Sequence, residues 1–105
     1  MEETFRRTVA DVGDVRVVTL RGELDMQSAE GLADWLVEIP GPSVVVDLSE
    51  LTFMDTSGIT VMVRVRQRLG DSFVLTRPQP NVRRIFEITG LGGWLSEWDP
   101  RWSDG

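Results

Sequence analysis

The hydrophobic and polar positions of this chain follow two periods, which predict strands and helices in a mixed order. Residues 4–10 alternate from one position to the next, as in a strand of modest strength near a sheet edge. Residues 15–20 form a stronger β-rich run after turn residues at 11–14. Because the turn is short, we expect these two strands to form an antiparallel hairpin.

A helix is predicted after Asp25, because apolar residues then recur every three or four positions. The predicted buried stripe consists of Met26, Ala29, Leu32, Ala33 and Leu36. Asp25 is well placed as the N-cap, where its carboxylate accepts hydrogen bonds from the first free backbone N–H groups. The run Ile39-Pro40-Gly41-Pro42 ends this helix.

Residues 43–69 carry the clearest pattern, a strand, a turn and a helix. The strand begins with the apolar run Val44-Val45-Val46 and includes Leu48, as is typical of a strand buried on both faces in a parallel sheet. After the polar turn Asp55-Thr56-Ser57-Gly58, the apolar positions return at helical spacing. In open α/β sheets, ligands and partners are met at the loops after the strands' carboxyl ends. This turn is therefore the candidate functional site.

The remainder of the chain completes an α/β fold. Residues 73–75 form a further short strand, which makes a right-handed βαβ unit with the strand before it, and residues 81–88 form a third amphipathic helix. Residues 94–98 are a candidate final strand. We predict a single domain over residues 1–99, with a mixed sheet of four or five strands and helices mainly on one face. Residues 100–105 are expected to be a loose C-terminal tail.

Composition narrows the chemistry further. The 105 residues contain no cysteine and no histidine, all eleven basic residues are arginine, and the formal net charge is −6. Disulfides, cysteine nucleophiles, common zinc sites and histidine-based catalysis are thereby excluded, so we expect no metal, no cofactor and no enzymatic activity. An acidic chain repels phosphate backbones and anionic membranes. Neither nucleic acid nor a membrane is an expected partner, and the expected location is the cytoplasm.

Ser57 and Gly58 each permit a structural and a functional interpretation. A serine at a helix start is commonly only a cap, but one cap suffices and Asp55-Thr56-Ser57 offers three. A glycine inside a helix costs about 0.5–1 kcal/mol relative to alanine. That cost is consistent with the close approach of a neighbour or a partner, and equally with the geometry of the loop.

The other polar candidates have simple structural explanations. Asp47, within the buried strand, is interpreted as a strand-end residue hydrogen-bonded to nearby amides. Arg64, Arg66 and Arg68 make the helix after the turn unusually basic for an acidic chain, as either a solvated face or a partner surface. A hydrolase with Ser57 as nucleophile would need a base, and the chain has neither histidine nor lysine.

Three motifs resemble those of STAS domains, particularly the bacterial anti-sigma factor antagonists. The stretch from Val44 to Ile59 is similar to the family's strand followed by an Asp-Ser-Ser-Gly or Asp-Ser-Thr-Gly turn. Gly22-Glu23-Leu24-Asp25 resembles the Gly-Glu-Leu-Asp loop beside that turn, and Phe86-Glu-Ile-Thr-Gly-Leu91 resembles the third helix and its exit. The motifs occur in the family's order and at its separations, and together they span nearly the whole chain.

The resemblance implies a binding switch. Unphosphorylated antagonists of this kind bind an anti-sigma factor that is also a GHKL-type serine kinase, and thereby release a sigma factor. The kinase phosphorylates the serine before the glycine, here Ser57, and a PP2C-type phosphatase restores the active form. Thr56 is the second possible acceptor. The expected partner-binding residues are Asp25, Asp55, Thr56, Ser57, Gly58 and Arg64.

The chain also departs from the family, and one alternative keeps the fold without the switch. Many relatives continue into a C-terminal helix where this sequence stops soon after Trp98, so contacts from that helix are expected to be missing or replaced by Trp98 and Trp102. We expect a monomer or weak dimer. In the alternative, the domain resembles STAS subunits that dock on an ABC-type lipid transporter without a phosphoswitch.

Overall fold

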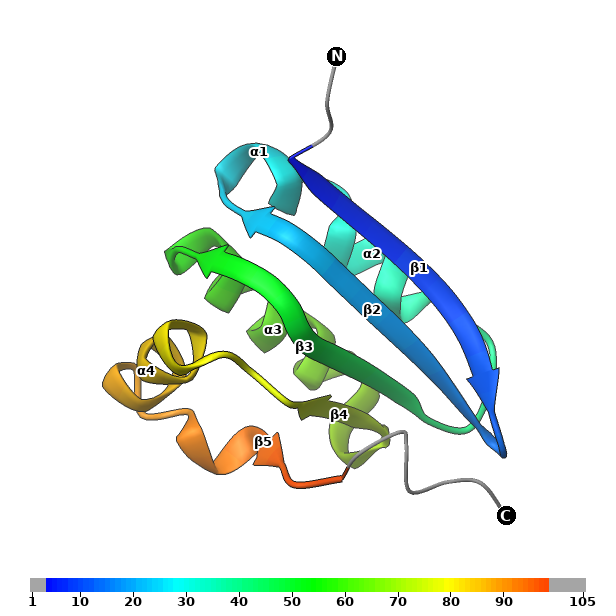
Figure 1. Cartoon of the computed structure of the whole chain (residues 1–105). Coiled ribbons are helices and arrows are strands. Elements are labelled where there is room, and N and C mark those ends of the chain that lie inside the picture. Colours follow the sequence, from blue (N-terminus) through cyan, green and yellow to red (C-terminus); the bar gives the residue numbers. More distant parts are fainter. Residues whose placement is uncertain (1–3, 99–105) are drawn as a thin grey trace.

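The computed structural model describes residues 4–98 as a twisted sheet flanked by helices (Figure 1). The strands within these residues are β1 Phe5–Val12, β2 Val15–Leu24, β3 Val44–Met54, β4 Phe73–Thr76 and β5 Leu95–Ser96. The α-helices are α1 Met26–Ala29, α2 Leu32–Val37, α3 Thr56–Leu69 and α4 Pro80–Ile88. Two short 3-10 turns, η1 Gly70–Ser72 and η2 Gly92–Trp94, precede β4 and β5.

The sheet is mixed, as the sequence predicts. Its strand order is β1-β2-β3-β4-β5, in which β1 and β2 form the antiparallel hairpin and the remaining neighbours are parallel. β3, α3 and β4 form the expected βαβ unit. The final strand is shorter than predicted, because only Leu95 and Ser96 pair with β4.

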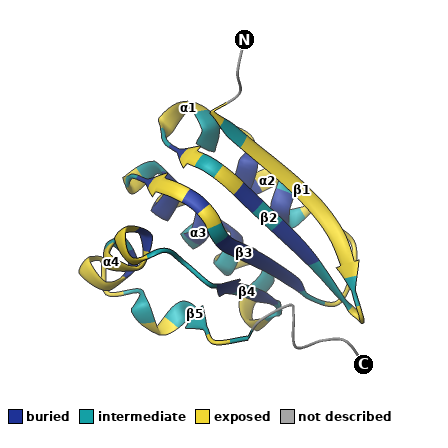
Figure 2. Ribbon diagram, viewed as in Figure 1, coloured by how far each residue is buried: buried dark blue, intermediate teal, exposed yellow. Residues whose placement is uncertain are grey.

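The hydrophobic core lies between the sheet and the helices α2, α3 and α4. Figure 2 shows buried residues concentrated along the middle of β2, the first half of β3 and the inner sides of the helices. Val46, Leu48 and Met62 are completely buried at the centre of this cluster. In Figure 1, α2 and α3 lie behind the sheet, which agrees with the prediction of helices mainly on one face. The helix α4 packs against β3 and α3 and contributes Val82 and Phe86 to the same core.

The single helix predicted after Asp25 is wrong, because the chain forms two short helices there. Glu30 leaves α1 in an extended conformation, and Gly31 has φ 78° before α2 begins. That left-handed conformation favours glycine and interrupts a continuous helix. Met26, predicted to be buried, is 77% exposed, whereas Leu32 and Leu36 are fully buried as expected.

Asp47 has the structural role predicted for it, but the prediction that it lies at a strand end is wrong, because it lies inside β3. Its Oδ1 accepts a hydrogen bond from the backbone N–H of Ser49, and its Oδ2 lies 3.1 Å from Nη1 of Arg77. β3 continues six residues beyond Leu48 to Met54, so the strand is longer than its apolar run indicates. This extension carries the chain to the candidate turn.

The described part of the chain contains no helix long and apolar enough to cross a membrane. The boundary predicted after residue 99, the tail at 100–105 and Trp102 lie outside the described residues. Trp35 and Trp94 pack against the core, and each also lies under an arginine. The guanidinium carbon of Arg7 is 4.5 Å from the ring centre of Trp35, and that of Arg66 is 5.2 Å from the ring centre of Trp94.

Candidate functional site

The candidate turn lies where β2 and β3 end side by side at one edge of the sheet. The two strands are parallel, and Leu24 pairs with Met54 as their last residues. Asp25 and Asp55 therefore follow at equivalent positions. The backbone N–H of Asp55 donates to the carbonyl oxygen of Leu24 at 3.1 Å, which joins the two segments beyond the paired strands. The predicted neighbourhood of these two loops is thus confirmed.

Asp55 caps the helix α3. Its Oδ1 accepts a hydrogen bond from the backbone N–H of Ser57 at 2.8 Å, while its own backbone is extended, as is typical of an N-cap residue. A carboxylate therefore satisfies one of the free backbone N–H groups at the start of the helix. Ser57 is the second residue of α3, and the interpretation of its side chain as the cap is wrong.

The Ser57 hydroxyl is left available for other chemistry. The residue is partly exposed, and within residues 4–98 its hydroxyl has no hydrogen-bond partner. Thr56, the residue before it, is exposed, and its carbonyl oxygen accepts from the Thr60 hydroxyl at 3.1 Å. Two hydroxyls thus lie at the start of α3, next to the Asp55 carboxylate.

Asp25 caps α1 through a reciprocal capping box. Its Oδ1 accepts from the backbone N–H groups of Gln27 and Ser28, each at 3.0 Å, and the Ser28 hydroxyl accepts from the Asp25 backbone N–H at 2.8 Å. The hydrogen bond from the Ser28 backbone is the largest of the effects that lower the pKa of Asp25 below its ordinary value of 3.8. The predicted N-cap is confirmed, and its carboxylate remains ionised at neutral pH.

Gly58 is needed inside the molecule. A Cβ at this position would lie 2.6 Å from Cγ of Met54 and 3.0 Å from Cδ2 of Leu24, both buried. Only glycine lets the first turn of α3 approach the ends of β2 and β3 so closely. Of the two explanations left open by the sequence, the close approach of a neighbour is the one observed, and the neighbours belong to this chain.

Hydrogen bonds from Thr52 and Asn81, which the sequence analysis did not single out, fix the end of β3. The Thr52 hydroxyl donates to the Gly22 carbonyl oxygen at 3.0 Å, and Nδ2 of Asn81 donates to the Thr52 carbonyl oxygen at 2.8 Å. Gly22 has φ 97°, and a Cβ there would lie 2.0 Å from the carbonyl oxygen of Thr4. In the sequence, the only sign of these contacts is a polar residue, Thr52, three positions before Asp55.

Two large apolar side chains flank the carboxylates. Met26, directly after Asp25, is 77% exposed, and Phe53, two residues before Asp55, is 45% exposed. Aromatic and methionine side chains are more frequent in protein interfaces than on the rest of a protein surface. The edge of the sheet therefore combines polar groups with apolar contact area.

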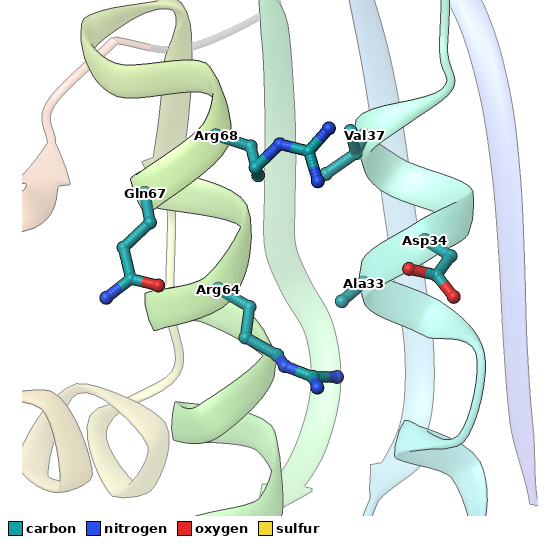
Figure 3. A pocket seen from close by; sticks show the side chains of 6 residues that line it. All are labelled: Ala33, Asp34, Val37, Arg64, Gln67 and Arg68. Carbon is teal, nitrogen blue, oxygen red and sulfur yellow. The ribbon is translucent and has the colours of Figure 1, made fainter.

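Arg64 lies apart from this edge, on the side of α3 that faces α2. It lines a shallow pocket of about 250 Å³ together with Ala33, Asp34, Val37, Gln67 and Arg68. Figure 3 shows Arg64 and Arg68 projecting from α3 toward α2. Of the predicted site residues, Asp25, Asp55, Thr56, Ser57 and Gly58 are thus brought together, and Arg64 is not.

Within the described ranges, no cluster of three or more carboxylates could hold a metal ion.

Comparisons of sequence and of structure with known proteins lead to the same family. Residues 6–100 match the STAS domain family. An anti-sigma F factor antagonist from Lysinibacillus sphaericus is 30% identical over 88 residues, covering 77% of this chain and 75% of that protein. A solved anti-sigma factor antagonist from Mycobacterium paratuberculosis is 29% identical with TM-score 0.76, covering 87% and 82% of the two chains. The unphosphorylated form of the anti-sigma factor antagonist SpoIIAA is 24% identical with TM-score 0.75, covering 90% and 89%, and shares the fold.

Proposed function

The chain belongs to the STAS domain family, and we propose that it acts as an anti-sigma factor antagonist controlled by phosphorylation of Ser57. Its unphosphorylated form binds an anti-sigma factor that is also a GHKL-type serine kinase, and this binding releases a sigma factor. Phosphorylation of Ser57 ends the binding, and a PP2C-type phosphatase restores it. The domain is the substrate of this cycle, and its own residues catalyse no step.

The observation that carries this proposal is the Ser57 hydroxyl at the start of α3, which has no hydrogen-bond partner among residues 4–98. Asp55 supplies the cap, so the serine is not required to hold the helix start. The residue is partly exposed, beside a second hydroxyl on Thr56. A kinase can reach such a hydroxyl without unfolding the helix.

A phosphoryl group at this position is compatible with the fold. It adds about −1.5 to −2 charges at pH 7. The start of an α-helix favours negative charge, because free backbone N–H groups and the helix dipole point toward it. Folding of the domain should therefore survive phosphorylation of Ser57.

Binding of a partner over the same position is not compatible with the phosphoryl group. A bound partner would remove water from the new charge next to Asp55, near Asp25 at the neighbouring strand end. Burial of an unpaired ion costs several kcal/mol, and each ~1.4 kcal/mol changes a dissociation constant tenfold. A loss of binding of two or more powers of ten is therefore expected.

The proposal is tested by release of a sigma factor. The purified chain is added to a complex of the anti-sigma kinase and its sigma factor, and free sigma factor is measured by size-exclusion chromatography without nucleotide and with ATP. We expect release without nucleotide, followed by reassembly of the original complex as ATP is consumed. A chain that releases no sigma factor in either condition, but copurifies with an ABC-type transporter ATPase, would support the docking alternative.

A further inference from the structure

One longitudinal stripe of α3 joins Ser57 to two arginines. Arg64 and Arg68 follow Ser57 by seven and eleven residues, close to two and three turns of an α-helix, so all three lie on the same side of the helix. The stripe is about 16 Å long at 1.5 Å per residue. A partner that covers Ser57 and continues along α3 therefore meets both guanidinium groups.

Among residues 4–98, neither arginine has a carboxylate partner. Neither Arg64 nor Arg68 forms an ion pair or side-chain hydrogen bond among residues 4–98, and both are exposed. Asp34 also lines the pocket between α2 and α3 but pairs with neither of them. Like charges four residues apart weaken a helix. Within the described residues, this pair is therefore a positive site without an ion pair, on a chain of net charge −6.

Arg66, on the same helix, differs from these two arginines. Its Nη2 lies 3.4 Å from Oδ1 of Asp71, and its guanidinium lies over the ring of Trp94. Arg66 is thus used inside the molecule, between α3, η1 and η2. Arg64 and Arg68, in contrast, lie in line with Ser57 on α3 and beside the pocket.

We infer that the pocket between α2 and α3 binds an acidic segment of the anti-sigma partner, and that Arg64 and Arg68 are its contacts. The inference rests on the proposed function and adds a partner chemistry and an orientation to it. The stripe is acidic at its Ser57 end, through Asp55, and basic at its other end. A segment with its carboxylates over the arginines is therefore oriented in one direction along α3, and its opposite end lies over Ser57.

The test is a pair of double variants with equal charge changes. Arg64→Glu/Arg68→Glu reverses the proposed site, and Arg83→Glu/Arg84→Glu reverses two exposed arginines of α4. Binding of each protein, and of the wild type, to the purified anti-sigma kinase is measured by calorimetry at low and high salt, after circular dichroism has verified folding. The neutral pair Arg64→Gln/Arg68→Gln keeps the test valid if the charge reversal prevents folding.

We expect the α3 reversal to weaken binding by about 10- to 100-fold and the α4 reversal by less than about threefold. The neutral pair should also flatten the salt dependence, because screened charge pairs are lost. Equal weakening by both reversals, or none by the α3 variants, would overturn the inference while wild-type binding leaves the proposed function intact. Failure of the wild type to bind any anti-sigma kinase would instead refute the proposed function and, with it, this inference.

Discussion

Asp25 and Asp55 occupy equivalent positions one residue beyond the paired ends of β2 and β3, and each caps the helix that follows it. The Asp55 backbone N–H also donates to the carbonyl of Leu24, so the two caps are fixed to one another. The start of α3 is therefore held by the sheet and by a carboxylate. The side chain of Ser57 is therefore not needed to cap α3.

Replacement of Ser57 should separate binding from stability. Ser57→Ala is expected to keep partner binding and to abolish phosphorylation, whereas Ser57→Asp is expected to weaken binding at least tenfold. Both should leave the melting temperature nearly unchanged, because Asp55 remains the cap and a helix start accepts negative charge. The measurements are calorimetric titration with the kinase and thermal unfolding. A large loss of stability in either variant would mean that the serine is mainly structural.

Gly58→Ala should destabilise the fold by about 1–3 kcal/mol, as overpacking in a core does. The new Cβ would collide with Met54 and Leu24, and this outweighs the better helix propensity of alanine. Urea unfolding measures the loss. Gly93→Ala is the matched control, because nothing lies within 4 Å of its Cβ position, and it should stay within about 0.5 kcal/mol of wild type. Equal stability of the two variants would contradict the packing role of Gly58.

The Asp25 cap predicts a dependence of stability on pH. Its pKa is lower in the folded state than the ordinary 3.8, so its contribution is present above that value and is lost as the pH falls through the folded pKa. Asp25→Asn keeps a residue able to cap and removes the titration. Thermal unfolding across this acidic range should therefore give a flatter profile for Asp25→Asn than for wild type. Asp14→Asn, in the exposed β1–β2 turn, should retain the wild-type slope; a flatter profile for it too would refute the assignment.

Arg77→Ala should cost about 2–3 kcal/mol, because it leaves the carboxylate of the buried Asp47 without its ion pair. Arg77 has φ 60°, so alanine keeps the unfavourable backbone conformation while losing the contact. The control Arg83→Ala, on the exposed side of α4, should change the free energy of unfolding by less than about 0.5 kcal/mol. Adding Asp47→Asn to Arg77→Ala should cause less loss than the sum of the single changes, and strict additivity would mean that the two side chains do not interact.

The sequence predicted the fold and the positions of the two helix caps because both depend on short-range patterns. The apolar run at Val44 to Leu48, the hairpin and the cap residues Asp25 and Asp55 each follow from local rules of burial and hydrogen bonding. The break at Gly31 was missed because the apolar spacing continues across it, and periodicity does not reveal a left-handed residue.

The remaining features of the site depend on contacts between distant residues. The reason for Gly58 lies in Leu24, thirty-four positions earlier, and the end of β3 is held by Asn81. Neither contact leaves a mark on the spacing of polar and apolar residues. The exposure of Met26 follows from the early end of α1, which also could not be seen in the helical pattern.

The central claim is that Ser57 is the acceptor of a regulatory phosphoryl group, and intact-mass spectrometry tests it most directly. The chain is incubated with ATP and each GHKL-type anti-sigma kinase of its source organism, beside Ser57→Ala and Thr56→Ala. We predict a gain of one phosphoryl group in the wild type and in Thr56→Ala, mapped to Ser57, and none in Ser57→Ala. A folded wild-type chain that gains no phosphoryl group with any of these kinases, or a Ser57→Ala variant that is phosphorylated as readily as the wild type, would contradict the claim.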